Sequence, residues 1–121
     1  MSQTNHLKIY NSAMFLLKDF YERVPRFSKQ YKYLLGEKII DCIIRMIMNI
    51  VSANGERVDH KRIIFIESIL SNIEELFIYI RIAEELKQFK SATAYPFLIE
   101  KLMDISRQSS GWKKIYIPRN S

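Results

Sequence analysis

Scarcity of helix-breaking residues is the feature that most limits what this chain can fold into. No proline occurs between Pro25 and Pro96, and Gly36 and Gly55 are the only glycines in that interval. Apolar residues recur there three and four residues apart, which is the spacing of one helix face, and no segment shows the period-two alternation of a half-buried strand. The sequence therefore predicts an all-α protein built from long helices.

Breakers and capping residues delimit four helices. The residue before a proline is disfavoured in a helix, so Val24-Pro25 is predicted to end the first one. Ser28 and Thr93 are predicted N-caps, and Asn54-Gly55 is predicted to end the second helix with a left-handed residue. The predicted helices cover residues 5–23, 28–53, 58–89 and 93–110, and a basic tail follows at 111–121.

The length of the chain bounds its organisation. Its 121 residues suffice for one domain and not for two. Amphipathic helices joined by short connections predict a single antiparallel four-helix bundle with up-down-up-down topology over residues 1–121. A domain of this size buries roughly two thirds of the surface that its unfolded chain exposes, so it needs neither a disulfide nor a metal ion to fold.

The first two helices are rich in apolar residues. The face that the first helix is predicted to turn to the core consists of Leu7, Tyr10, Ala13, Met14, Leu17, Phe20 and Tyr21. The predicted core stripe of the second helix consists of Tyr31, Leu35, Ile39, Cys42, Met46 and Ile50. Beside that stripe lies a second apolar surface of Leu34, Ile40, Ile43, Ile44, Ile47, Met48 and Val51. A helix that is apolar over most of its circumference is buried on more than one side, so we expect Ile40, Ile44, Ile47, Met48 and Val51 to form an oligomer interface.

Positive charge is in excess and is unevenly distributed. The chain has 19 Lys and Arg against 13 Asp and Glu, a formal net charge of +6, which favours polyanionic partners. One group of cations around the first connection has no acid between Arg23 and Gly36, and consists of Arg23, Arg26, Lys29 and Lys32. A second group in the tail consists of Lys113, Lys114 and Arg119. We expect these cations as a group to bind RNA or DNA.

Aromatic residues are interleaved with these cations. They are Phe27, Tyr31, Tyr33, Trp112 and Tyr116. Cations beside aromatic rings suit single-stranded nucleic acid, whose phosphates meet the charges while its bases stack on the rings. The alternative is that the rings cap the bundle core and the cations solvate its ends. No base-reading motif is present, so backbone charge is expected to govern any binding.

Patterns that would indicate an enzyme are absent from the sequence. His6, His60 and a single cysteine do not have the spacing of a metal site. Cys42 lies among isoleucines and is expected to be a buried, unreactive thiol. The carboxylate pairs Glu74-Glu75 and Glu84-Glu85 are expected to lie on a solvated helix face. We therefore expect no catalytic residue, no cofactor and no metal.

Location is also constrained by the sequence. One cysteine excludes an intramolecular disulfide and favours a reducing compartment. The N-terminal residues are polar, without the apolar segment of a secretory signal. The most apolar run, residues 39–51, is interrupted by Asp41 and Arg45 and is too short to span a bilayer. We expect a cytoplasmic protein without a membrane partner.

Three segments carry a resemblance to a known family. They are residues 24–39 (VPRFSKQYKYLLGEKI), 80–86 (IRIAEEL) and 110–114 (SGWKK). In this order and spacing, over residues 5–114, they resemble the Avd proteins, the accessory variability determinants of diversity-generating retroelements. That family belongs with four-helix-bundle proteins related to the rRNA intervening-sequence protein. Family members usually have Phe-Pro-Lys where this chain has Val24-Pro25-Arg26, and a second glycine where it has Ser110.

The resemblance implies an assembly and a role. Avd proteins form homopentameric barrels, bind nucleic acid through a basic surface and associate with the reverse transcriptase of the retroelement. They support the adenine-directed mutagenesis of mutagenic retrohoming without being its catalyst. The basic positions at which motif and charge coincide are Arg26, Lys29, Lys32, Arg81, Lys113 and Lys114. For Arg81, a structural ion pair with a nearby acid is an equal alternative.

A second function stays open at this point. The chain could instead be a structural or scaffolding bundle of the intervening-sequence type, with no reverse-transcriptase partner. Binding of RNA and DNA at several salt concentrations distinguishes the two.

Overall fold

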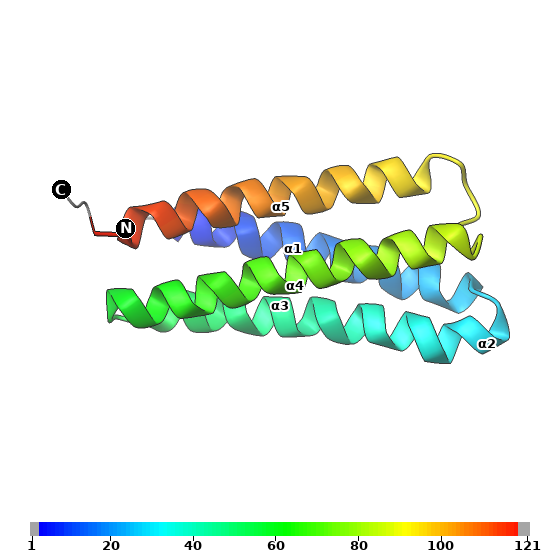
Figure 1. The fold of residues 1–121 in the computed structure, drawn as a ribbon, viewed down its shortest axis with the longest axis horizontal. Coiled ribbons are helices and arrows are strands. Elements are labelled where there is room, and N and C mark those ends of the chain that lie inside the picture. Colours follow the sequence, from blue (N-terminus) through cyan, green and yellow to red (C-terminus); the bar gives the residue numbers. More distant parts are fainter. Residues whose placement is uncertain (1–2, 119–121) are drawn as a thin grey trace.

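Residues 3–118 are described by the computed structural model, with side chains from residue 8 onward, and this part of the chain contains helices and no strand. The helices are α1 (Gln3–Arg23), η1 (Val24–Arg26), α2 (Lys29–Tyr31), η2 (Lys32–Gly36), α3 (Glu37–Gly55), α4 (Asp59–Glu85) and α5 (Ala94–Tyr116). Four long rods lie side by side along one axis, the second being the continuous run of α2, η2 and α3 (Figure 1). The prediction of an all-α bundle is confirmed.

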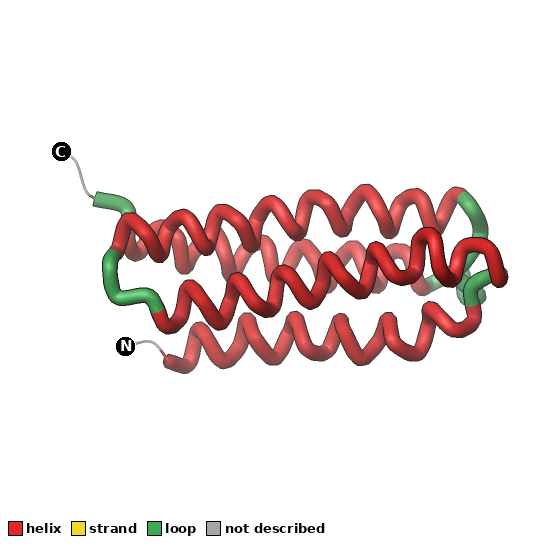
Figure 2. Tube along the Cα trace, turned by 90° about the horizontal axis from the view of Figure 1, so that it is seen from below, coloured by secondary structure: helices red, strands yellow, loops and turns green. Residues whose placement is uncertain are grey.

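The hydrophobic core lies between the four rods. α3 packs against α1 and α4, and α5 packs against α4 and α1. The connections that follow α1 and α4 lie at one end of the bundle, and the α3–α4 connection lies at the other end with the last turn of α5 (Figures 1 and 2). Fully buried side chains from all four rods include Ile9, Leu16, Phe20, Ile39, Met46, Ile50, Ile66, Ile73, Leu76, Leu98, Leu102 and Trp112.

The core face of α1 differs from the predicted one. Ala13 and Phe20 are buried as expected, but Ile9 and Leu16 are buried as well, while Tyr21 is 53% exposed. Tyr10, Met14 and Leu17 are half-buried at the flank of the core. The reason is that α1 carries two adjacent apolar stripes, and only the neighbouring helices determine which one is covered.

The second rod contains a π turn at η2, close to the end of α1. A π turn is wider than an α turn because its hydrogen bonds span five residues. Leu35 and Gly36 point inward from it, whereas Leu34 is 68% exposed. A Cβ atom on Gly36 would lie only 2.4 Å from Cγ1 of Val24. The glycine therefore permits the close approach of α1 and the second rod.

The end of α4 differs from the predicted boundary. The helix ends at Glu85, four residues before position 89, because Lys87 adopts a left-handed φ of 60°. The Lys87 N–H donates to the Glu84 carbonyl and the Gln88 N–H donates to the Ala83 carbonyl, both at 2.9 Å. This is the hydrogen-bond pair of a Schellman motif, formed here without glycine.

Two further termini also correct the sequence prediction. No residue of the Asn54-Gly55 turn has a positive φ; instead, Nε of Arg62 donates to the Ala53 carbonyl at 3.0 Å, and its Nη2 donates to the Glu56 carbonyl. The predicted tail is helical as far as Tyr116, because the buried Trp112 extends the core face of α5. Ser28 and Thr93 do occupy N-cap positions, but neither side chain makes a capping hydrogen bond.

We expect Gly36→Ala to destabilise the fold. The added methyl group would overlap the Val24 side chain, and overpacking of this kind typically costs about 1–3 kcal/mol. The free energy of unfolding in denaturant measures the effect, and Val24→Ala in the same chain should recover part of the loss because it removes the overlapping atom.

Gly55→Ala is the matched control. A Cβ atom at Gly55 meets no atom within 4 Å, and its φ is not positive. Alanine is favoured over glycine in a helix by about 1 kcal/mol, so this variant should be as stable as the parent protein or more stable. Equal destabilisation by both substitutions would contradict the proposed role of Gly36.

Candidate nucleic-acid interface

The turn between α1 and α2 presents the first predicted group of cations. Arg26 and Lys29 are exposed, and Lys32 is half-buried. Phe27 lies between them but points inward, is 4% exposed and contacts the ring of Phe89 with centroids 6.1 Å apart. The cations therefore project outward from a turn that is anchored by an aromatic side chain.

A buried glutamine fixes this turn to the connection between α4 and α5. Oε1 of Gln88 accepts a hydrogen bond of 2.7 Å from the Ser28 N–H, and its Nε2 donates to the Leu86 carbonyl at 2.7 Å. Gln88 is 5% exposed, so both groups of its amide need these partners. The amide thus holds two connections together that are 60 residues apart in the sequence.

The α4–α5 connection adds two cations that the sequence analysis missed. Lys87 and Lys90 are exposed on either side of Gln88 and Phe89, which point inward. The predicted helix over residues 58–89 concealed them, because it placed Lys87 inside a helix. We name the set of Arg26, Lys29, Lys32, Lys87 and Lys90 the basic end. None of these five side chains forms an ion pair with any residue between 8 and 118.

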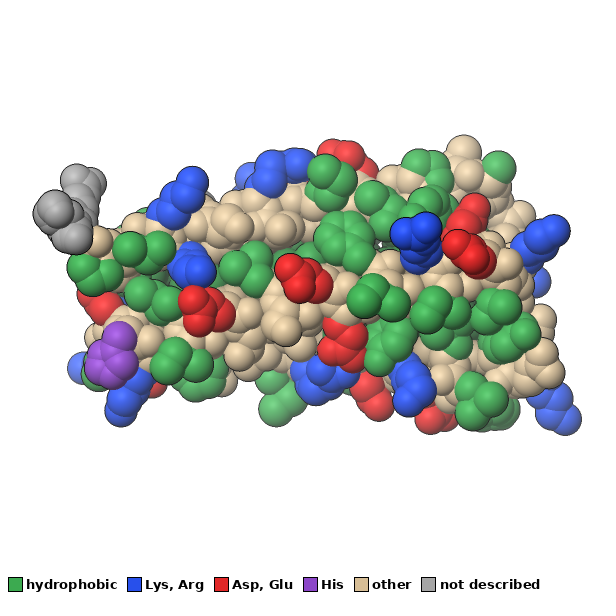
Figure 3. Space-filling model, viewed as in Figure 1, with side chains coloured by type: hydrophobic (Ala, Val, Ile, Leu, Met, Phe, Trp, Pro, Cys, Tyr) green, Lys and Arg blue, Asp and Glu red, His purple; other side chains and the backbone are tan. Residues whose placement is uncertain are grey.

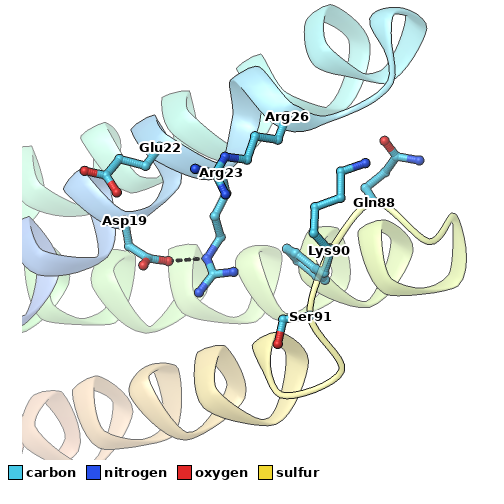
Figure 4. A pocket seen from close by; sticks show the side chains of 8 residues that line it. Asp19, Glu22, Arg23, Arg26, Gln88, Lys90 and Ser91 are labelled. Carbon is cyan, nitrogen blue, oxygen red and sulfur yellow. Dashed lines mark hydrogen bonds and ion pairs between the residues drawn. The ribbon is translucent and has the colours of Figure 1, made fainter.

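A cavity of about 230 Å³ opens at the basic end (Figure 4). Its lining residues are Asp19, Glu22, Arg23, Arg26, Gln88, Phe89, Lys90 and Ser91. Nε of Arg23 lies 2.5 Å from Oδ2 of Asp19, and Figure 4 shows this ion pair beneath Arg26. Arg23, a predicted binding residue, is therefore partly neutralised within the chain.

The remaining predicted cations lie elsewhere. Arg81 forms an exposed ion pair with Glu85 at 3.6 Å on α4, which favours the structural alternative for this residue. Lys113 pairs with Glu67 at 3.1 Å, and Lys114 is exposed one residue later on α5. Arg119 lies outside the described residues.

The two predicted groups of cations lie at separate places within the chain. The last turn of α5 and the basic end lie at opposite ends of the bundle (Figure 1). α4, which runs between those ends, has 27 residues and is about 40 Å long at a rise of 1.5 Å per residue. Lys113 and Lys114 consequently belong to a separate group of charges.

The aromatic residues that accompany the two groups of cations are divided between core and surface. Phe27 and Trp112 are buried, as the core-capping alternative predicts. Tyr31 is half-buried against the core, and Tyr116 lies under the guanidinium of Arg62, whose Cζ is 4.6 Å from the ring centroid. Tyr33 is 59% exposed.

The predicted interface residues of α3 are available on its outer side. Met48 and Val51 are 62% and 56% exposed, and Ile40, Ile44 and Ile47 are half-buried. Ile43, which the sequence analysis assigned to the same surface, is instead fully buried in the core. One residue of the expected apolar surface therefore serves the chain's own fold.

The apolar residues of α1 continue this surface. Ser12 of α1 is hydrogen-bonded to Gln108 of α5, so this side of α1 faces α5. Arg45 and Asn49 of α3 are hydrogen-bonded to residues of α4, so their side of α3 faces α4. The remaining flanks of both helices border the contact between α1 and α3. They carry Tyr10, Met14, Leu17 and Tyr21 from α1, and Ile40, Ile44, Ile47, Met48 and Val51 from α3. We name these residues the α1/α3 face.

The side of the bundle formed by α4 and α5 is shown in Figure 3, where apolar side chains are interspersed with acids and bases. α4 carries the exposed Ile64 and Ile78.

Cys42 lies in a polar seam between α3 and α4. Its Sγ donates a hydrogen bond to the Asn72 carbonyl at 3.4 Å. Nearby, the Arg45 guanidinium donates two hydrogen bonds to the Glu75 carboxylate, at 3.2 and 3.0 Å. The same carboxylate accepts a hydrogen bond from the Tyr79 hydroxyl at 2.9 Å. Burial and the nearby Glu75 carboxylate raise the pKa of Cys42 to about 12. The thiol is therefore protonated near neutral pH, as expected for an unreactive core cysteine.

Two features of other functional classes do not occur in the described part of the chain. No three His, Cys, Asp or Glu side chains of that part come together as a metal site. No helix of residues 3–118 combines the length and hydrophobicity needed to cross a membrane.

Comparisons with known proteins gave no relatives: no protein-family model matches the chain, and no curated protein matches it.

Proposed function

We propose that this protein is a non-enzymatic, self-associating nucleic-acid-binding subunit of the Avd type, which accompanies the reverse transcriptase of a diversity-generating retroelement. The observation that carries the proposal is the basic end, where five cations that form no ion pair with residues 8–118 project from two connections that Gln88 holds together. Unpaired cations on a fixed frame suit a polyanion, because binding requires neither the breaking of ion pairs nor the ordering of a loop.

Binding at the basic end is governed by phosphate charge. Each phosphate that a cation neutralises releases counterions, so affinity falls steeply with salt concentration. The five cations extend from Arg26 to Lys90 across the end of the bundle, and no base-reading motif accompanies them. The proposed substrate class is RNA or DNA recognised through its backbone.

Self-association is the second part of the proposal. The residues of the α1/α3 face are apolar, and their burial between copies would remove Met48, Val51 and Tyr21 from water. We propose that five copies form a barrel through this face, each chain being an up-down-up-down bundle. A pentamer of chains with a net charge of +6 each would present five basic ends to one polynucleotide.

Association with a reverse transcriptase rests on the three motifs. The first, residues 24–39, forms the turn and the π turn of the basic end, and the second, residues 80–86, runs into the Schellman turn that exposes Lys87. Two of the motifs thus build the surface that would meet the template RNA. The third, residues 110–114, lies on the last turns of α5.

We expect Arg26→Ala with Lys29→Ala to weaken binding to RNA and DNA of unrelated sequence. Loss of two phosphate contacts should also flatten the plot of log affinity against log salt by about 0.7–0.9 for each contact. Thermal stability should stay nearly unchanged, because both side chains are exposed and unpaired. Fluorescence anisotropy at several salt concentrations measures affinity and slope together.

A charge-matched pair at the other end of the bundle provides the control. Lys61→Ala with Lys114→Ala removes the same charge from exposed positions distant from the basic end. An equal loss of affinity in both double variants would contradict the assignment of binding to the basic end.

We expect Met48→Lys with Val51→Lys to convert the assembly into a monomer of 14.4 kDa. Both side chains are exposed in the single chain, so charges there spare its fold but would be buried in the interface. Light scattering gives the mass. Ile64→Lys with Ile78→Lys, at the equally exposed positions of α4, should leave the mass unchanged. A parent protein that is monomeric at micromolar concentration would overturn the self-association.

Association with the polymerase has its own test. A reverse-transcriptase gene next to the gene for this chain, flanked by near-identical repeats that differ at adenines, is the expected genomic context. The polymerase from that locus should co-purify with this protein. A locus without such a gene would favour the scaffolding alternative.

A further inference from the structure

Tyr33 is the aromatic residue of the basic segment that the core leaves available. Its side chain is 59% exposed and makes no hydrogen bond or ring contact with the described residues. Phe27, by contrast, is 4% exposed and contacts Phe89, and Tyr31 packs against the core. The segment thus keeps one aromatic ring in solvent, where a large apolar group has no role in the fold of the chain.

Tyr33 lies within the π turn. η2 runs from Lys32 to Gly36, and Leu35 and Gly36 face inward from it while Tyr33 is exposed. Contact with Val24 fixes Gly36, so the position of the turn is determined by packing. Single π turns are rare and are frequent at functional sites.

Three cations lie close to Tyr33 in the sequence. Lys29 precedes it by four residues. Lys32 is its neighbour in sequence, and Arg26 lies in the preceding turn. No carboxylate occurs until Glu37, one turn further on, which bounds the segment. A segment with one exposed ring and three cations offers the two kinds of contact that single-stranded nucleic acid makes with proteins.

We propose that Tyr33 stacks on a base of single-stranded nucleic acid whose phosphates contact Arg26, Lys29 and Lys32. This inference rests on the proposed nucleic-acid binding and names the form of the substrate. A duplex keeps its bases stacked inside and offers no free base face to the ring, so the basic end selects single strands over duplexes of the same sequence. Charge alone gives no such preference.

Tyr33→Ala and Tyr33→Phe test the proposal in the full-length protein. The probes are an unstructured single-stranded oligonucleotide and its duplex, measured by fluorescence anisotropy. Loss of one base–aromatic stack lowers affinity about fivefold or more. Tyr33→Ala should therefore weaken single-strand binding by this factor, leave duplex binding unchanged and keep the salt slope, because no charge is removed. Tyr33→Phe should bind like the parent protein, since it keeps the ring.

Leu34→Ala is the matched control, because Leu34 is 68% exposed on the same turn but has no aromatic face. It should leave both affinities unchanged. If the parent protein binds single strands and Tyr33→Ala binds them equally well, the stacking role is wrong while the proposed function stands. If the parent protein binds neither probe at low salt, the proposed function fails as well. A change of assembly mass in Tyr33→Ala would assign Tyr33 to a subunit contact and overturn the inference.

Discussion

The contact between Val24 and Gly36 is the constraint on which the basic end depends. It joins the end of α1 to the π turn of the second rod. Any other residue at position 36 would place its Cβ atom 2.4 Å from Cγ1 of Val24, so that the side chain or the backbone would have to move. With the turn fixed there, Phe27 reaches the core and Phe89, and the Ser28 N–H reaches the buried amide of Gln88. Packing and one polar clamp thus hold the turn without any contribution from its cations, which remain free for a ligand.

Charge and apolar surface occupy different parts of the molecule. The five cations of the basic end lie at one end of the bundle, whereas the apolar residues of the α1/α3 face lie along its side. Assembly through the side would leave the ends accessible, so self-association and nucleic-acid binding need not compete. Several copies would then act on one polynucleotide, and such multivalent binding gains affinity without any new kind of contact.

The distribution of polar residues on α3 also serves the fold. Arg45 and Asn49, which lie on the narrow polar strip of an otherwise apolar helix, pair with Glu75 and Asn72 of α4. The Arg45–Glu75 pair lowers the pKa of Glu75, chiefly through the guanidinium hydrogen bond. Because both side chains are partly exposed, the pair contributes at most about 1 kcal/mol, and its main effect is to orient the two helices. The polar side of α3 therefore faces α4, and the apolar residues that α3 contributes to the α1/α3 face point away from α4.

The sequence by itself determined the all-α class and the core stripe of α3, because helical periodicity acts over a few residues. It also located the cations of residues 26–32. Only the tertiary structure decided that Lys87 and Lys90 join them, that Lys113 and Lys114 lie at the other end, and which stripe of α1 is buried. The left-handed conformation of Lys87 has no local sequence signature. The hydrogen bonds that Gln88 makes with Ser28, and Arg62 with the end of α3, join residues that are apart in the sequence. Such contacts depend on how the four rods pack, and the apolar periodicity of one helix does not specify which helices lie next to it.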